Sequence, residues 1–178
     1  MFREGSSILW SRRSILAAGV AFALPGCGFR PIHATGAGPS ADVARELSAV
    51  RVARVPERNG QILRRALEER FATTGTQARY DLRVGVGFAA EIQGYRRDGT
   101  PSRVRYVGTA PWSLFTMATP AVLLSNGMER TFDAYGLPEN QFFAADNSRD
   151  AMERRLVEQL AEDVARRVAA YFANRAPA

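Results

Sequence analysis

The sequence contains no lysine, one cysteine and one histidine in 178 residues. A single cysteine cannot form an internal disulfide, and a single histidine cannot supply a metal site with several imidazole ligands. That histidine, His33, also lies in a segment rich in glycine and proline. We therefore expect neither a metal nor a non-covalent cofactor.

The remaining residues offer no substitute for these missing groups. Glu91 and Asp98 could be taken as a carboxylate pair, but no histidine or cysteine accompanies them. Gly85 and Gly87 lie inside an alternating strand pattern and not at the strand-to-helix turn that a phosphate loop requires. We predict that the protein has no catalytic residue and is not an enzyme.

Long apolar runs are also scarce, and the most conspicuous one, residues 15–24, is near the start of the chain. It is much shorter than the ~20 residues that cross a bilayer. Arg12 and Arg13 precede it, and Leu24-Pro25-Gly26-Cys27 follows. This layout is typical of a cleaved secretory signal, with a cysteine at the cleavage point. It resembles a bacterial lipobox, which predicts removal of residues 1–26 and acylation of Cys27.

The export route stays open, because Ser11-Arg12-Arg13-Ser14-Ile15-Leu16 also resembles a twin-arginine signal. The alternative to export is a small buried helix in a cytosolic protein, with Cys27 an ordinary core thiol. The charges fall only on the N-terminal side of the run, and the cysteine stands where a lipobox needs it. Export is therefore the favoured interpretation.

All basic residues are arginines, and the chain has a formal net charge of +6. The planar guanidinium group matches phosphate and carboxylate oxygens well, although the codon usage of a GC-rich genome would also enrich arginine. Nucleic acid is the generic partner of a basic domain, but an exported lipoprotein would rarely meet it. We therefore expect an acidic amphiphile at a membrane as the partner, and no nucleic acid.

The first half of the mature chain predicts a tether, a strand and a helix. Residues 27–44 contain glycine and proline and few large apolar residues, which predicts an acylated flexible tether. Residues 47–55 show β-branched alternation, and residues 58–74 have apolar positions at helical spacing. One domain is then expected over residues 45–174.

The second half predicts a long meander and a final helix. Residues 80–95 begin with strict alternation of apolar and polar positions, and residues 103–117 and 122–135 follow as two further strands. Asn126-Gly127 could be a hairpin turn, but a bulge is preferred because only four residues precede it in the last strand. Residues 146–173 have apolar positions mostly four apart, which predicts a long helix.

These elements predict an α+β fold with the order β-α-β-β-β-α. Two helices would pack on one face of a four-stranded mixed sheet to form a two-layer sandwich. The initial β-α-β unit allows a right-handed parallel crossover, and the strand order is otherwise left open.

Two parts of the chain resemble a known family. Cys27-Gly28-Phe29-Arg30-Pro31 is similar to the start of mature LPS-assembly lipoproteins of the LptE family, of the alphaproteobacterial type. Residues 160–172, LAEDVARRVAAYF, resemble the family's last helix, and Tyr135 and Phe143-Ala144 match as well. The middle of the chain agrees with the family in element order and length.

The resemblance implies a function that spacing alone does not reveal. Family members occupy the lumen of the outer-membrane β-barrel LptD, help it to assemble, and contact lipopolysaccharide on its way to the cell surface. By the same analogy Cys27 would carry an N-acyl and an S-diacylglycerol group, and Gly28 is compatible with sorting to the outer membrane. Another outer-membrane lipoprotein that faces the periplasm and acts as a small interaction module is the alternative.

Four arginines are the candidate contacts for lipopolysaccharide phosphates: Arg96, Arg97, Arg103 and Arg105. The first two fall at the predicted hairpin tip, and the other two point to one face of the return strand because they are two residues apart. The alternative is a solvated polar face that protects the strand from aggregation.

Overall fold

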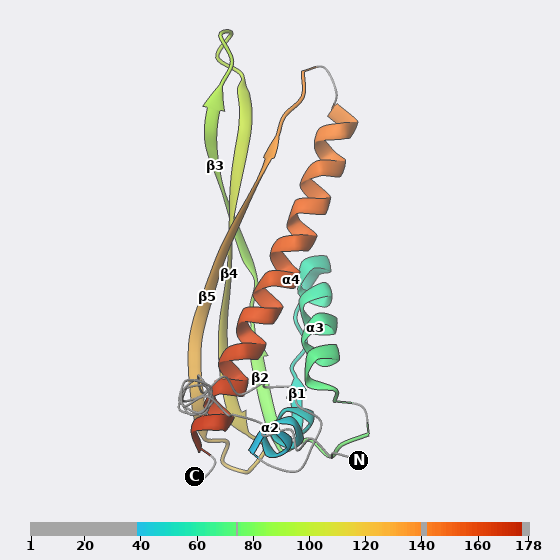
Figure 1. Ribbon diagram of the computed structural model, residues 1–178, viewed down its shortest axis with the longest axis vertical. Helices are drawn as coiled ribbons and strands as arrows, with labels where there is room; N and C mark the ends of the chain where they lie inside the picture. The colour runs from blue at the N-terminus through green and yellow to red at the C-terminus, as the bar shows by residue number, and fades with distance from the viewer. Residues whose placement is uncertain (1–38, 74, 140–141, 176–178) are drawn as a thin grey trace, which may run out of the picture. The chain divides into compact units, whose positions relative to one another are not determined.

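The computed structural model describes residues 39–73, 75–139 and 142–175 (Figure 1). Within them lie three helices, α2 (Pro39–Ser48), α3 (Glu57–Phe71) and α4 (Phe142–Arg175). The strands are β1 (Val50–Val52), β2 (Tyr80–Val84), β3 (Gly87–Tyr95), β4 (Pro101–Thr116) and β5 (Leu123–Gly136). The predicted signal sequence, Cys27 and His33 lie outside the described residues.

Strand β4 is the centre of a mixed sheet. Strand β5 pairs antiparallel with nearly the whole of β4, and β2 and β3 pair one after the other with its opposite side. Strand β1 pairs parallel with β2. The predicted strand 80–95 is therefore two strands in line, with an interruption at Gly85 and Val86. Gly85 N–H still donates to Pro111 O at 2.9 Å, but Pro111 has no N–H to return a second bond.

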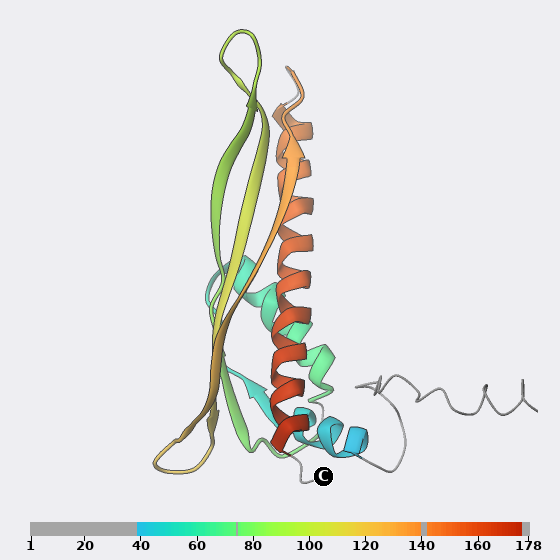
Figure 2. The same cartoon turned by 60° about the vertical axis from the view of Figure 1, so that its left-hand side comes forward.

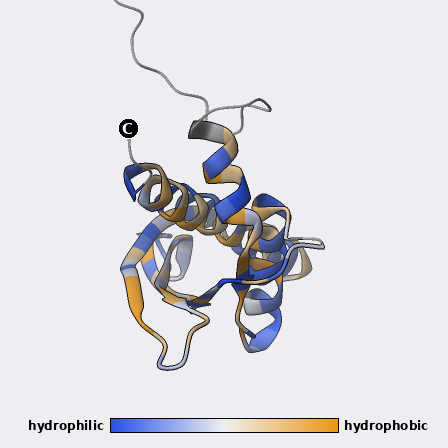
Figure 3. Ribbon diagram, turned by 90° about the horizontal axis from the view of Figure 1, so that it is seen from below, coloured by the Kyte–Doolittle hydropathy of each residue, from blue (hydrophilic) through white to orange (hydrophobic). Residues whose placement is uncertain are grey.

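The three helices lie on one side of this sheet (Figures 1 and 3). Leu160 on α4 and Leu63 and Leu67 on α3 are fully buried there, together with Leu82 and Leu114 on the sheet. The core consists of the apolar stripes of the helices and the inward residues of β2 and β4. The predicted α+β class, with helices on one face of a mixed sheet, is confirmed.

The prediction of a flexible tether up to Ala44 was wrong at its end, because residues 39–48 form helix α2. Val43 and Leu47 are four residues apart and are buried in the core, so this helix is held by packing. The described residues therefore form three helices instead of the two predicted. The first strand begins at Val50 instead of Leu47, and the final helix begins at Phe142, four residues before its predicted start.

The predicted bulge at Asn126-Gly127 was also wrong. The register between β4 and β5 is continuous from Arg103↔Gly136 to Leu114↔Ser125, and the irregularity lies beyond it, before the pair Phe115↔Leu123. Gly127 instead leaves room for the side chain of Trp112. A Cβ at this position would lie 3.0 Å from Cζ2 of Trp112, which is directly opposite on β4.

No helix in the described ranges is both long enough and apolar enough to cross a membrane.

Candidate binding face of the sheet

The sheet face that points away from the helices is called the outer face here. On β4, Ala110, Trp112 and Leu114 are buried on the helix side. Because side chains alternate along a strand, the odd-numbered residues of β4 belong to the outer face. The register then places Arg83 of β2 and Arg130 of β5 on the same face. Figure 2 shows that no described helix covers this side of the sheet.

Three arginines lie on the part of the outer face formed by β4 and β5: Arg103, Arg105 and Arg130. The guanidinium group of Arg105 lies over the ring of Phe132, 4.2 Å from its centroid. Its Nε is 3.8 Å from Oε2 of Glu91, and this buried Nε has no hydrogen-bond partner among the described residues. Arg105 is thus held mainly by stacking on an aromatic ring.

A second cluster lies where β1 and β2 meet. Oδ1 of Asp81 accepts hydrogen bonds from Nε of Arg51 at 3.1 Å and from Nη2 of Arg51 at 2.7 Å. Oδ2 accepts a bond from Nε of Arg83 at 3.1 Å, and the Arg83 guanidinium lies over the ring of Phe115. Burial raises the pKa of Asp81, but the hydrogen bonds from Arg51 and Arg83 outweigh burial, so its pKa is lower than usual. This carboxylate fixes two arginines on the outer face.

Large apolar side chains accompany these cations. Met128 is 67% exposed and Phe132 is 64% exposed, and both are on the outer face of β5. Five arginines and two acids, Asp81 and Glu91, make the face positive overall. A surface that combines guanidinium groups with exposed apolar side chains matches a ligand that has anionic groups and hydrocarbon chains.

The structure places the four predicted arginines in three different settings. Arg103 and Arg105 do point to one face of β4, opposite Val104 and Tyr106. Arg97 is exposed in the turn at the hairpin tip.

Arg96 instead closes the hairpin. Its Nη1 donates to Pro101 O at 2.7 Å and its Nη2 donates to Leu137 O, so it joins the hairpin to the segment after β5.

Three arginines of the outer face were not predicted from the sequence: Arg51, Arg83 and Arg130. Each belongs to a different strand, and only the pairing register brings them to the same face. The alternation around Arg83 was visible in the sequence, but the lack of a helix over that side was not.

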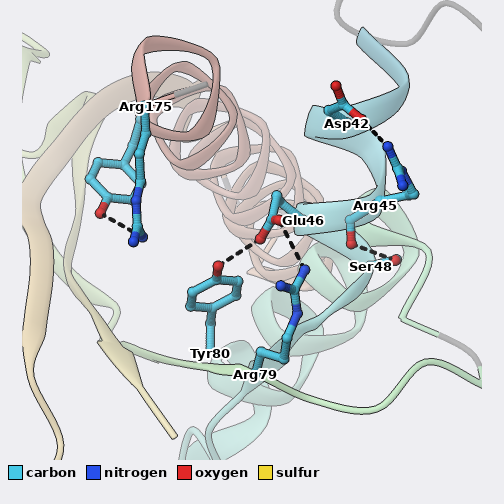
Figure 4. A network of polar contacts seen from close by, with 8 residues as sticks. Asp42, Arg45, Glu46, Ser48, Arg79, Tyr80 and Arg175 are labelled. Atoms are coloured by element: carbon cyan, nitrogen blue, oxygen red, sulfur yellow. Dashed lines mark hydrogen bonds and ion pairs between the residues drawn. The ribbon is translucent and has the colours of Figure 1, made fainter. Parts of the chain in front are cut away.

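The polar cluster in Figure 4 lies at the end of the sheet next to α2 and lines a cavity of about 540 Å³. Tyr80 donates to Oε2 of Glu46 at 2.6 Å, and Arg79 lies 2.9 Å from Oε1 of Glu46. Burial raises the pKa of Glu46, but hydrogen bonds from Tyr80 and Arg79 lower it below its usual value. These groups bond mainly to one another and join α2 to β2. In the described ranges no group of three or more His, Cys, Asp and Glu side chains could hold a metal ion.

The family model for LptE, described as lipopolysaccharide-assembly, matches residues 47–168. The chain belongs to the LptE family. This family takes part in lipopolysaccharide assembly and consists of lipoproteins without enzymatic activity. Its model covers α3, the whole sheet and most of α4. Comparison with curated proteins gives no match.

Solved structures share the LptE-type fold of this chain. A Caulobacter crescentus protein is 21% identical, with a TM-score of 0.60 over 76% of this chain and 98% of its own. Rare lipoprotein B from Shewanella oneidensis is 11% identical, with a TM-score of 0.56 over 71% and 96%. A minor lipoprotein from Acinetobacter baumannii is 16% identical, with a TM-score of 0.52 over 73% and 95%. At these identities the likeness concerns the fold.

Proposed function

We propose that this chain is an outer-membrane lipoprotein, anchored through acylated Cys27, that forms a complex with an LptD-type β-barrel. In this proposal the domain plugs the barrel lumen from the periplasmic side and assists the transport and insertion of lipopolysaccharide, and it makes or breaks no covalent bond. Membership of the LptE family supports the role in lipopolysaccharide assembly. The lipobox-like stretch ending at Cys27 supports the anchor.

The proposed contact with lipopolysaccharide is through the outer face of the sheet. Lipopolysaccharide combines phosphate groups with acyl chains, and the outer face combines arginines with the exposed side chains of Met128 and Phe132. Arg103, Arg105 and Arg130 are proposed to contact the phosphates through charge-assisted hydrogen bonds. Arg97 stays a proposed contact at the hairpin tip. Arg96 is the weakest of the predicted four, because carbonyl oxygens already occupy its guanidinium group.

A triple variant, Arg103→Gln, Arg105→Gln and Arg130→Gln, tests this assignment. The matched control removes the same charge from the exposed helix surfaces through Arg65→Gln, Arg154→Gln and Arg166→Gln. We expect the face variant to bind lipopolysaccharide about tenfold or more weakly, since three contacts of about 0.5–1 kcal/mol each are lost. The control should bind as the wild type does. Unchanged affinity of the face variant at every salt concentration, or an equal loss in the control, would contradict the assignment.

A further inference from the structure

The two long edges of the sheet differ in how they are protected. Along β5, helix α4 packs against the strand, and Arg155 and Arg167 of α4 pair with Asp133 and Glu129 of β5. The N–H of Ala134, next to Asp133, donates to the Asp133 carboxylate at 2.7 Å. The β5 edge therefore carries charged side chains and a locally satisfied donor, both of which oppose pairing with another strand.

The edge of β3 has less such protection over residues 87–92, and the register irregularities of this strand lie beyond Ile92. Gly85 N–H donates to β4, and backbone groups alternate in direction along a strand. Phe88, Ala90 and Ile92 therefore direct their N–H and C=O groups away from β4. On that side β1 pairs with β2 and ends at Val52, and no described residue pairs with β3 there. Figures 1 and 2 agree that no other described segment lies beside this edge.

The side chains of β3 are also largely exposed on both faces of the sheet. Its nine residues, GFAAEIQGY, contain one charged residue and no proline. That residue, Glu91, lies beside Arg105 of β4. Ile92 is 48% exposed and Tyr95 is 64% exposed. An open, nearly uncharged strand edge of this kind is a template for another strand.

We propose that the β3 edge pairs antiparallel with the β3 edge of a second copy of this chain, with the two-fold axis at Ala90. In this register Phe88 lies opposite the partner's Ile92 on the helix side of the joined sheet, and the two small Ala90 side chains meet at the axis. Glu91 lies opposite the partner's Ala89, so the two carboxylates are not directly opposed. The register therefore opposes no like charges directly and places the smallest side chains at the axis. The pairing concerns the chain on its own and does not depend on the barrel complex.

In this register residues 87–93 of the two strands pair, which buries less area than the ~1,600 Å² of a standard interface, so the association is expected to be weak. Covalent trapping is the suitable readout. In the proposed register the two residues at position 90 form a hydrogen-bonded pair with Cα atoms about 5.5 Å apart, within the range that a disulfide bridges. The two residues at position 89 are diagonal neighbours about 7–8 Å apart, which is too far for easy bridging.

The experiment compares the full-length lipoprotein carrying Ala90→Cys with the same protein carrying Ala89→Cys, each purified in detergent and mildly oxidised. The wild type sets the background, including any cross-link from unacylated Cys27. We expect severalfold more disulfide-linked dimer for Ala90→Cys than for Ala89→Cys. An equimolar mixture of Phe88→Cys and Ile92→Cys proteins should form a mixed disulfide-linked dimer. Its yield should exceed the yield of homodimer from either protein alone. Equal cross-linking of the Ala89 and Ala90 variants, no cross-linking above wild type, or cross-links only to a different protein would overturn the proposal.

Discussion

The indole of Trp112 lies against the backbone of Gly127, directly across the β4–β5 pair, so closely that a Cβ on Gly127 would lie 3.0 Å from Cζ2. Trp112 is only 5% exposed, and its Nε1 donates to Glu129 at 3.3 Å. The ring therefore has little room to move, and the glycine makes this packing possible.

The first prediction concerns this contact. Gly127→Ala should destabilise the domain by about 1–3 kcal/mol, because overpacking forces a side chain or the backbone to shift. Gly136→Ala on the same strand is the matched control, since a Cβ at that position would have no atom within 4 Å apart from those of its chain neighbours. Chemical unfolding measures both. Equal stability of the two variants would show that Trp112 can shift away from the added methyl group without loss of unfolding free energy.

The lowered pKa of Asp81 predicts how stability depends on pH. A carboxyl group whose folded pKa lies below its unfolded value, ordinarily 3.8, stabilises the fold above that value. This contribution is lost as the pH falls from about 4 through the folded pKa. Asp81→Asn should reduce the free energy of unfolding at neutral pH by about 1–3 kcal/mol. It should also flatten the loss of stability below pH 4. An acid unfolding profile with the same slope as the wild type would contradict the assigned role.

A comparison of Arg96 with its neighbour Arg97 tests whether Arg96 has a structural role in the hairpin. Arg96→Gln removes the bonds to Pro101 O and Leu137 O, so amide hydrogen exchange at the hairpin tip and in the segment after β5 should accelerate. Arg97→Gln removes the same charge from an exposed turn position and should leave exchange unchanged. If Arg96→Gln leaves the tip equally protected, its bonds do not hold the hairpin.

The sequence pattern predicted some elements well because their signals are local. The alternation from Tyr80 to Phe88 identified extended structure, although not the break between β2 and β3, and the four-residue spacing from Leu156 to Val168 identified the last helix. Helix α2 was missed since its two buried residues, Val43 and Leu47, follow a segment dominated by glycine and proline. The glycine and proline content predicted a tether there, and the apolar stripe of α2 is short. The helix that packs against this stripe, α4, is distant in sequence.

The candidate site was only half predictable for a related reason. Arg103 and Arg105 share a face by spacing alone, but Arg83 and Arg130 join them through strand pairing. The dipeptide Asn126-Gly127 is typical of a turn. In the structure, however, a glycine is needed at position 127 because Trp112 of the neighbouring strand packs against it. Contacts between distant segments thus decided both cases.

The mature N-terminus provides a separate prediction for the anchor. Mass analysis of the protein from membranes should find a chain that begins at Cys27 and carries three acyl chains, as the resemblance to lipoproteins implies. One chain alone would bind a membrane only marginally. An unmodified Cys27, or cleavage at another position, would contradict the lipoprotein signal while leaving the fold and the outer face untouched.

Affinity purification of the lipoprotein from detergent-solubilised outer membrane, with identification of what remains bound, is the decisive test of the proposed complex with a β-barrel. We expect a stable complex with a very large outer-membrane β-barrel protein. Recovery of only a soluble periplasmic partner, with no barrel protein, would contradict it and favour an interaction module that faces the periplasm.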